Sequence, residues 1–148
     1  MNQAINFKVQ NCTGIIHLNR PKVLNALNLE MVELFLDKLK KWQLDFSIKR
    51  VILTGEGQAL CAGGDIKALY LSSKKSNLKK LFLQKEYTLN YAISQFSKPY
   101  LSIWNGVVMG GGIGLSIYGN ARLVTDKVKL AMPETAIGFF PDVGGSYF

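Results

Sequence analysis

The sequence predicts a mixed α/β fold in which strands and helices form layers around one core. Short apolar runs with the character of strands alternate with two longer segments whose apolar residues recur at helical spacing. The chain has 148 residues, of which 48% are apolar and 19% charged, so it is long enough to bury a core and too apolar for a disordered protein. No internal repeat or Pro/Ser-rich linker divides it. We therefore expect residues 1–148 to form a single domain.

The first third of the chain predicts two strands, a helix and a third strand. Residues 5–9 and 14–19 are strand-like runs around an Asn-Cys-Thr-Gly turn, and Pro21 ends the second run. Asn28 is a suitable N-cap for the helix, because its side chain can accept a hydrogen bond from a free N–H of the first turn. Residues 51–54 form a short apolar strand closed by a Gly-Glu-Gly turn. Five apolar residues at helical spacing mark the core face of the helix: Met31, Leu34, Phe35, Leu39 and Trp42.

The remainder predicts a second long helix and three further strands. Helical periodicity returns after the loop at residues 61–65, and Pro99 stops it. Residues 100–104 form a strand that leads into a glycine cluster, which opens a further helix. Residues 122–125 and 129–131 form two short strands, and the rest is mostly loop. The apolar residues of the second long helix are Leu78, Leu81, Phe82, Leu89, Ile93 and Phe96.

The stretch from residue 99 to residue 121 contains no charged residue and permits two interpretations. Its length suffices for a membrane span, and Gly106, Gly110 and Gly114 have GxxxG spacing. Six glycines and several Asn and Ser residues weaken that interpretation. We expect a buried strand–turn–helix and no membrane span.

The charge balance favours anionic partners. Eighteen Lys and Arg residues against ten Asp and Glu residues give a formal net charge of +8. Such a surface attracts nucleic acid, lipid head groups or phosphorylated small molecules, and the charge alone does not distinguish them. Nucleic acid is the least favoured of these, because the chain has no recognised binding motif and no aromatic residues interleaved with the basic ones.

Cysteine and histidine usage excludes several classes of site. Cys12 and Cys61 can form one bridge at most, and their spacing does not fit zinc. His17 is the sole histidine, so a Ser-His-Asp or Cys-His catalytic site would have to include it, but it lies in an apolar run and we expect an ordinary strand residue. We expect no metal site. The first eight residues have neither an apolar leader segment nor an Arg/Ser-rich transit pattern, which predicts a cytoplasmic protein.

Two glycine-rich loops, at residues 61–65 and 110–114, are candidates for ligand binding. A dinucleotide fingerprint would need glycine where Leu115 stands, and no Gly-Lys-Ser/Thr follows for a phosphate loop. Glycines allow a backbone N–H to approach a ligand oxygen closely, so one N–H from each loop can form an oxyanion hole. The alternative is that these glycines only permit tight turns and helix–strand packing. The residues leave both open.

Three carboxylates lie near these loops or in the last loop. Asp65 is best placed as a helix cap. Glu134 and Asp142 each follow an apolar residue and a proline, in apolar loop sequence. Carboxylates in such surroundings are either desolvated and reactive or paired with a cation. If the two converge, one can act as nucleophile or base and the other as acid or orienting group.

Four segments carry a resemblance to a known family. Residues 20–27, 61–67 and 105–112 resemble the acyl-CoA motif and the two glycine loops of the crotonase (enoyl-CoA hydratase/isomerase) superfamily. Residues 132–148 are similar to its 3-hydroxyisobutyryl-CoA hydrolase branch. The resemblance implies a crotonase-like ββα spiral. Members are much longer, so it also implies that this chain corresponds to an N-terminal portion that lacks the C-terminal helices.

The resemblance assigns roles to five residues. Gly64 and Gly111 match the two N–H donors of the oxyanion hole, and Glu134 and Asp142 match the catalytic carboxylates. Glu86 matches a substrate-contacting glutamate; without the resemblance it would be taken for a solvated helix residue. No metal or redox cofactor is implied, and CoA belongs to the substrate. The six lysines between Asp65 and Glu86 can attract the CoA phosphates or can form an ordinary solvated face.

One departure from the superfamily pattern bears on the reaction. Hydratases carry a glutamate shortly after the glycine cluster, where this chain has Gly114. The resemblance therefore favours hydrolysis of an acyl-CoA thioester, with 3-hydroxyisobutyryl-CoA from valine breakdown as the expected substrate. Two alternatives stay open. One is enoyl-CoA hydratase/isomerase-type activity, and the other is an inactive fragment that binds CoA or self-associates, including as a homo-oligomer.

Overall fold

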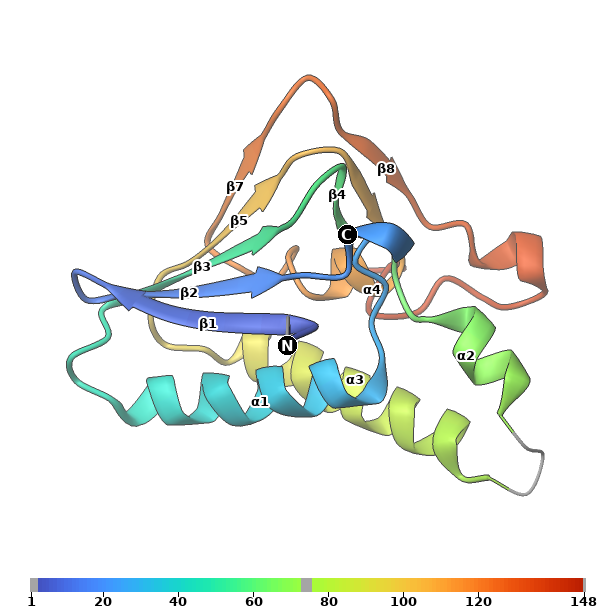
Figure 1. Cartoon of the computed structure of the whole chain (residues 1–148), viewed down its shortest axis with the longest axis horizontal. Coiled ribbons are helices and arrows are strands. Elements are labelled where there is room, and N and C mark those ends of the chain that lie inside the picture. Colours follow the sequence, from blue (N-terminus) through green and yellow to red (C-terminus); the bar gives the residue numbers. More distant parts are fainter. Residues whose placement is uncertain (1–2, 73–75, 148) are drawn as a thin grey trace.

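The computed structural model describes residues 3–72 and 76–147 of the chain. Two sheets and a set of helices form the mixed α/β fold that the sequence predicts (Figure 1). The first sheet has the strand order β1-β2-β3-β5-β7, formed by β1 (Ile5–Gln10), β2 (Thr13–Leu18), β3 (Arg50–Gly55), β5 (Tyr100–Trp104) and β7 (Ala121–Val124). The second sheet has the order β4-β6-β8, formed by β4 (Ala59–Cys61), β6 (Val107–Met109) and β8 (Lys129–Ala131).

The two sheets are connected by a repeated bend of the chain. β3 continues into β4, β5 into β6 and β7 into β8, so that each of these three strands of the first sheet is followed by a strand of the second. Within each sheet these successive strands pair in parallel. Figure 1 shows the resulting stack of bends, which is the spiral that the resemblance implied. β1 and β2 form the antiparallel hairpin expected at the start.

Along the chain, the helices occur between the strands. Their bounds are α1 (Leu29–Leu44), α2 (Ile66–Leu71), α3 (Leu78–Ser94) and α4 (Gly111–Gly114), with 3₁₀ turns η1 (Pro21–Val23) and η2 (Glu134–Ile137). α1 begins as predicted, because the Asn28 side chain accepts a hydrogen bond of 2.9 Å from the Met31 N–H. The predicted core face of α1 is buried except at Leu34, which is 40% exposed.

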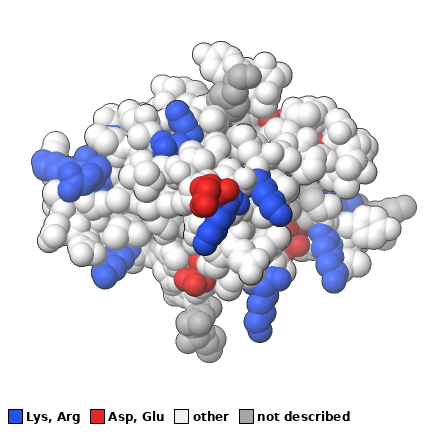
Figure 2. Space-filling view, turned by 90° about the horizontal axis from the view of Figure 1, so that it is seen from above, with Lys and Arg blue, Asp and Glu red and all other residues white. Residues whose placement is uncertain are grey.

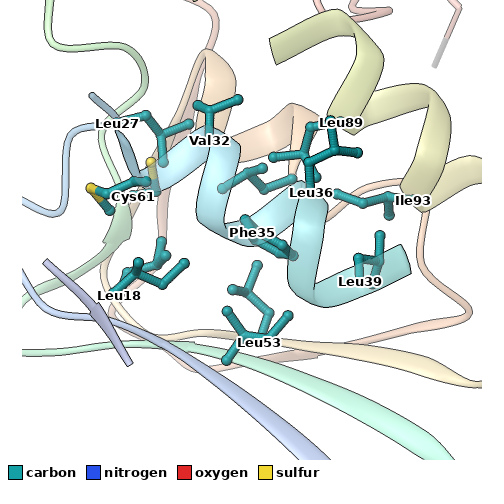
Figure 3. Close-up of a cluster of buried hydrophobic side chains, with 14 of the residues drawn as sticks. Leu18, Leu27, Val32, Phe35, Leu36, Leu39, Leu53, Cys61, Leu89 and Ile93 are labelled. Atoms are coloured by element: carbon teal, nitrogen blue, oxygen red, sulfur yellow. The ribbon is translucent and has the colours of Figure 1, made fainter. Parts of the chain in front are cut away.

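Helix α1 packs between the first sheet and α3. In Figure 3, Phe35 points from α1 toward Leu53 of β3, and Leu36 points toward Leu89 of α3. All four side chains belong to one continuous cluster of buried apolar residues. This packing fixes α3, whose buried face also carries polar residues that point toward the glycine loops.

Three short elements were not predicted from the sequence, and a fourth is shorter than expected. β4, β6 and α2 lie in segments that appeared to be loop, and the helix expected after the glycine cluster is the single turn α4. The other strands and long helices lie within one or two residues of their predicted bounds. In the uncharged segment, Tyr100, Ser102 and Trp104 of β5 are buried in the fold. No helix in the described ranges is both long and apolar enough to cross a membrane.

His17 is a strand residue, as the sequence predicts, and the two cysteines form no disulfide bond. His17 lies on β2 with its Nδ1 2.8 Å from Thr54 Oγ1 and its Nε2 3.1 Å from a Glu56 carboxylate oxygen. Cys12 and Cys61 are free thiols. Burial raises the pKa of the Cys61 thiol to about 12, so this thiol stays protonated and unreactive at neutral pH.

Candidate active site

The two glycine-rich loops lie against each other. Gly63 has a φ of +97°, and a Cβ added there would lie 3.2 Å from the Met109 carbonyl oxygen and 3.4 Å from the Gly111 nitrogen. The first loop is also fastened to the start of α1, because the Leu27 N–H donates to the Gly63 carbonyl at 2.8 Å. Glycine at residue 63 therefore allows a close approach of two segments that are distant in the sequence.

The backbone N–H groups of Gly64 and Gly111 are available to a ligand. Neither donates to an acceptor within residues 3–72 and 76–147. Gly111 is the first residue of the single turn α4, where the N–H has no partner within the turn. Gly64 lies beside Phe82, whose ring would be 3.1 Å from an added Cβ. An oxyanion hole requires free donors such as these two N–H groups. The use of Gly64 and Gly111 as an oxyanion hole stays a prediction.

Glu86 is the most deeply buried acidic residue of the site. It lies on α3 at 3% exposure, and a Cβ at Gly111 would collide with its Oε1. Burial raises the pKa of Glu86 to about 8, and the nearby charges of Asp142 and Glu134 add to this shift. The alternative interpretation of Glu86 as a solvated helix residue is therefore wrong. At neutral pH this side chain is mostly a protonated acid that can donate a hydrogen bond.

Glu134 borders the same glycine loop at the neighbouring residue Gly110. It begins the turn η2, and a Cβ at Gly110 would lie 2.7 Å from its Oε1. Its other oxygen, Oε2, is buried and has no hydrogen-bond partner in the described chain. A buried carboxylate oxygen without a partner is costly, which favours a role in which a ligand or water supplies the partner.

Asp142 is held by a residue that the sequence analysis missed. The Tyr87 hydroxyl donates a hydrogen bond of 2.7 Å to Asp142 Oδ2. Burial raises the pKa of the Tyr87 hydroxyl, and its bond to Asp142 and the charge of that residue add to the effect. The two residues are 55 positions apart, so no local pattern could have paired them. Position 87 directly follows Glu86, and that proximity was the only available signal.

The electrostatics of the three acidic residues indicate that they gather in one place. Asp142 and Glu134 both act on the protonation of Glu86. Clustered carboxyl groups of unequal protonation can divide the roles of base, nucleophile and acid among themselves. The described residues contain no group of three or more His, Cys, Asp or Glu side chains that could hold a metal ion.

Asp65 is a structural residue, as predicted. Its side chain caps α2 by accepting a bond of 3.1 Å from the Ala68 N–H, and it pairs with Arg20 at 2.9 Å. Burial alone would raise the pKa of Asp65, but these hydrogen bonds and the Arg20 charge lower it overall. Arg20 also donates to the Ala26 carbonyl, so the pair joins the segment before α1 to the first glycine loop.

The lysines between Asp65 and Glu86 are largely exposed. Lys67, Lys79 and Lys80 extend into solvent, and Lys85 lies 3.8 Å from Glu33. Lys74 and Lys75 lie outside the described residues. On the face of the molecule in Figure 2, basic side chains are spread out and outnumber the acidic ones. This arrangement fits both a solvated face and an attraction for phosphates.

Comparison with known proteins places these features in a family context. The family model for enoyl-CoA hydratase/isomerase matches residues 13–148. The chain is 51% identical over 137 residues to the 3-hydroxyisobutyryl-CoA hydrolase, mitochondrial, of Danio rerio, and 50% identical over 139 residues to that of Homo sapiens. These matches cover 91% and 93% of this chain, and the chain spans only 36% of the length of each relative.

Solved structures give the same fold under different names. A carnitinyl-CoA dehydratase from Mycobacterium thermoresistibile matches 99% of this chain and 44% of its own, with a TM-score of 0.94 and 47% identity. An enoyl-CoA hydratase from Rhodobacter sphaeroides matches 97% of this chain and 44% of its own, with a TM-score of 0.92 and 37% identity.

Proposed function

The chain belongs to the enoyl-CoA hydratase/isomerase family, and we propose that it serves the hydrolysis of a 3-hydroxyacyl-CoA thioester. The expected substrate is 3-hydroxyisobutyryl-CoA, and the products are 3-hydroxyisobutyrate and CoA. The names of the relatives at about 50% identity support this choice. The observation that carries it is the Glu134 carboxylate beside Gly110, with a buried oxygen that lacks a partner in the described chain.

The proposed mechanism uses both glycine loops. The thioester carbonyl oxygen accepts hydrogen bonds from the N–H groups of Gly64 and Gly111, which stabilise the negative charge that develops on it. Donors of this kind are each worth about 2.7–4 kcal/mol in the transition state. Glu134 either attacks the carbonyl carbon to form an anhydride or removes a proton from the water that attacks it. In both routes the C–S bond breaks and CoA leaves as a thiolate that is then protonated. In the anhydride route a water molecule then attacks the anhydride, which breaks its bond to Glu134, releases 3-hydroxyisobutyrate and restores the Glu134 carboxylate.

Asp142 is the second proposed catalytic carboxylate. Its bond from Tyr87 fixes its position, so it can orient the substrate hydroxyl or pass a proton toward the departing thiolate. Glu86 contacts the substrate beside Gly111 in this scheme. Neither step requires a metal ion or a redox cofactor.

A thiol-release assay tests the proposal. The chain is incubated with 3-hydroxyisobutyryl-CoA and a thiol reagent, and release is compared with that of Glu134→Gln and of the control Glu30→Gln on the exposed first turn of α1. We expect release by the wild-type chain and by the control, and at least a 100-fold loss in Glu134→Gln. Unchanged release in Glu134→Gln would refute the role of this residue.

A second candidate is enoyl-CoA isomerisation or hydration. The dehydratase and hydratase among the solved structures support it, because they are 47% and 37% identical to this chain. Gly114 counts against hydration, since it provides no carboxylate where the resemblance would require one. Turnover of a 3-enoyl-CoA without thiol release from the hydroxy ester would decide for isomerisation.

Three further points do not depend on which reaction the chain serves: binding without turnover, oligomeric state and location. Binding of a CoA ester without turnover, together with light scattering, separates a folded binder from a self-associating fragment. Homo-oligomer formation stays a prediction. The cytoplasmic location stays a prediction as well, and the relatives above carry the word mitochondrial in their names.

A further inference from the structure

A buried amide without partners lies next to the proposed site. Asn90 is on α3, one helical turn after Glu86 and on the same face, and it is 5% exposed. Neither its Nδ2 nor its Oδ1 has a hydrogen-bond partner among the described residues. Buried side-chain amides are nearly always bonded, because an unmet donor or acceptor is costly. A helix that needed only a core residue here would use an apolar one.

The surroundings of Asn90 connect it to the proposed catalytic groups. It lines a cavity of about 660 Å³ together with Tyr87 and Asp142. On its other side, a Cβ at Gly114 would lie 2.9 Å from both amide atoms and 2.8 Å from the Val143 Cβ. Glycine at residue 114 therefore leaves the space that the Asn90 amide fills. Residue 114 provides room for a neutral amide at the place where the sequence analysis noted a missing carboxylate.

We propose that Asn90 is a specificity-determining residue that binds the hydroxyl group of the acyl chain. This inference rests on the proposed function, because it places the acyl chain in the cavity beside Asp142. A hydroxyl both donates and accepts, so a single hydroxyl can bond with either or both of the amide atoms. An acyl chain without a hydroxyl satisfies neither atom. A site built to bond a hydroxyl rejects the analogue that lacks it, because its own polar groups then stay unpaired.

The test compares the binding of two CoA esters that differ in one hydroxyl. Affinities for 3-hydroxyisobutyryl-CoA and isobutyryl-CoA are measured by calorimetry in the Glu134→Gln background, where turnover is prevented. Asn90→Leu is the main variant, since leucine has a similar size and no polar atoms. Gln84→Ala, which removes an exposed amide from the same helix, is the matched control.

We expect the Glu134→Gln chain to prefer the hydroxy ester by about 10- to 100-fold, the range that loss of one buried hydrogen bond produces. Asn90→Leu abolishes this preference by weakening only the hydroxy ester, and Gln84→Ala retains it. Asn90→Leu also raises the melting temperature, because it removes an unpaired buried amide. If Asn90→Leu does not fold, Asn90→Ala gives the same comparison with a smaller side chain.

The outcomes separate this inference from the proposed function. Equal weakening of both esters, or a preference that survives in Asn90→Leu, overturns the role of Asn90, as does failure to bind either ester. A lower melting temperature with the preference intact indicates that Asn90 is a structural residue whose amide bonds a buried water. That result also overturns the proposed role of Asn90. If the wild-type chain releases no thiol while the preference of the Glu134→Gln chain still depends on Asn90, the inference is supported and the hydrolysis is refuted.

Discussion

The Glu86 carboxyl combines a structural cost with a chemical use. In the folded chain its pKa of about 8 means that it keeps its proton to well above the ordinary value of 4.5, mainly because it is buried. The unfolded chain releases that proton near the ordinary value. Between the two values the folded state binds one more proton than the unfolded state, so this residue lowers stability as the pH rises. The folded state thus carries an acid that is ready to donate a proton.

We predict that Glu86→Gln removes this pH dependence. The contribution of Glu86 is most favourable below about pH 4.5 and declines until about pH 8, by several kcal/mol over the window. Thermal or urea unfolding from pH 5 to pH 8 measures it, as the difference between the wild-type chain and the variant. Glu30→Gln serves as the exposed control. A constant difference between wild type and Glu86→Gln over this range would contradict the burial of a protonated acid.

In the proposed mechanism, Tyr87 is a positioning residue whose effect passes through Asp142. We predict that Tyr87→Phe lowers kcat of thioester hydrolysis about tenfold, because one hydrogen bond to a charged group is worth about 1.5 kcal/mol. KM changes little, since the ring that contacts the cavity remains. Steady-state kinetics with separate values of kcat and KM measure this, with the exposed Tyr70→Phe as control. An unchanged kcat would show that Asp142 needs no such support.

At the scale of elements, the long helices and most strands could be predicted because their signals are local. Asn28 and the apolar face after it define α1 within the sequence itself. β4 and β6 are each three residues long. β4 pairs with β6, and β6 also pairs with β8, and only this pairing gives them strand geometry, so no local pattern marks them. The solvent exposure of Leu34 could not be predicted from local sequence either. It depends on where the elements that pack against α1 lie, and the sequence of α1 alone does not give their positions.

The contact between α4 and β4 depends on one glycine. A Cβ at Gly112 would collide with the Cys61 carbonyl oxygen, and this backbone atom has no freedom to move aside. We predict that Gly112→Ala lowers the free energy of unfolding by about 1–3 kcal/mol, as overpacking does elsewhere. Urea titration measures this. Gly145→Ala is the control, because its Cβ would meet the flexible end of Met132 at 2.9 Å. Equal stability of the two variants would show that the loops can separate without cost.

At the scale of the whole molecule, the resemblance identified site residues that chemistry alone could not bring together. Glu134 and Asp142 drew attention by their apolar surroundings, but nothing local indicated that Glu86, on a helix with lysines, is buried close enough to both to feel their charges. Burial of Glu86 follows from the packing of α3 on α1 and on the glycine loops. Asn90 was missed for the same reason, since an isolated asparagine on a helix carries no signal until its surroundings are known.

The net charge of the chain leads to a prediction about ligand binding. A formal charge of +8 favours the approach of anions, and the phosphates of CoA are the anions of the proposed substrate. On the face shown in Figure 2 the basic side chains are spread out and form no single cluster. Charges on the surface interact over a screening length of about 10 Å at 0.1 M salt and about 3 Å at 1 M salt. We predict that affinity for a CoA ester falls steadily as NaCl is raised. A pantetheine ester with the same acyl group has no phosphate, so its affinity stays nearly constant.

Calorimetric titration of both esters at several salt concentrations measures the two slopes. Lys79→Gln and Lys80→Gln, which change residues in the first turn of α3, the helix that carries Glu86, are expected to reduce the slope for the CoA ester. Lys8→Gln on β1 is the matched control, because it removes the same charge from a strand at the edge of the first sheet. If all three variants reduce the slope equally, the attraction is a property of the net charge alone. If none does and the CoA ester is insensitive to salt, the basic surface has no part in binding, and the lysines of α3 are an ordinary solvated face.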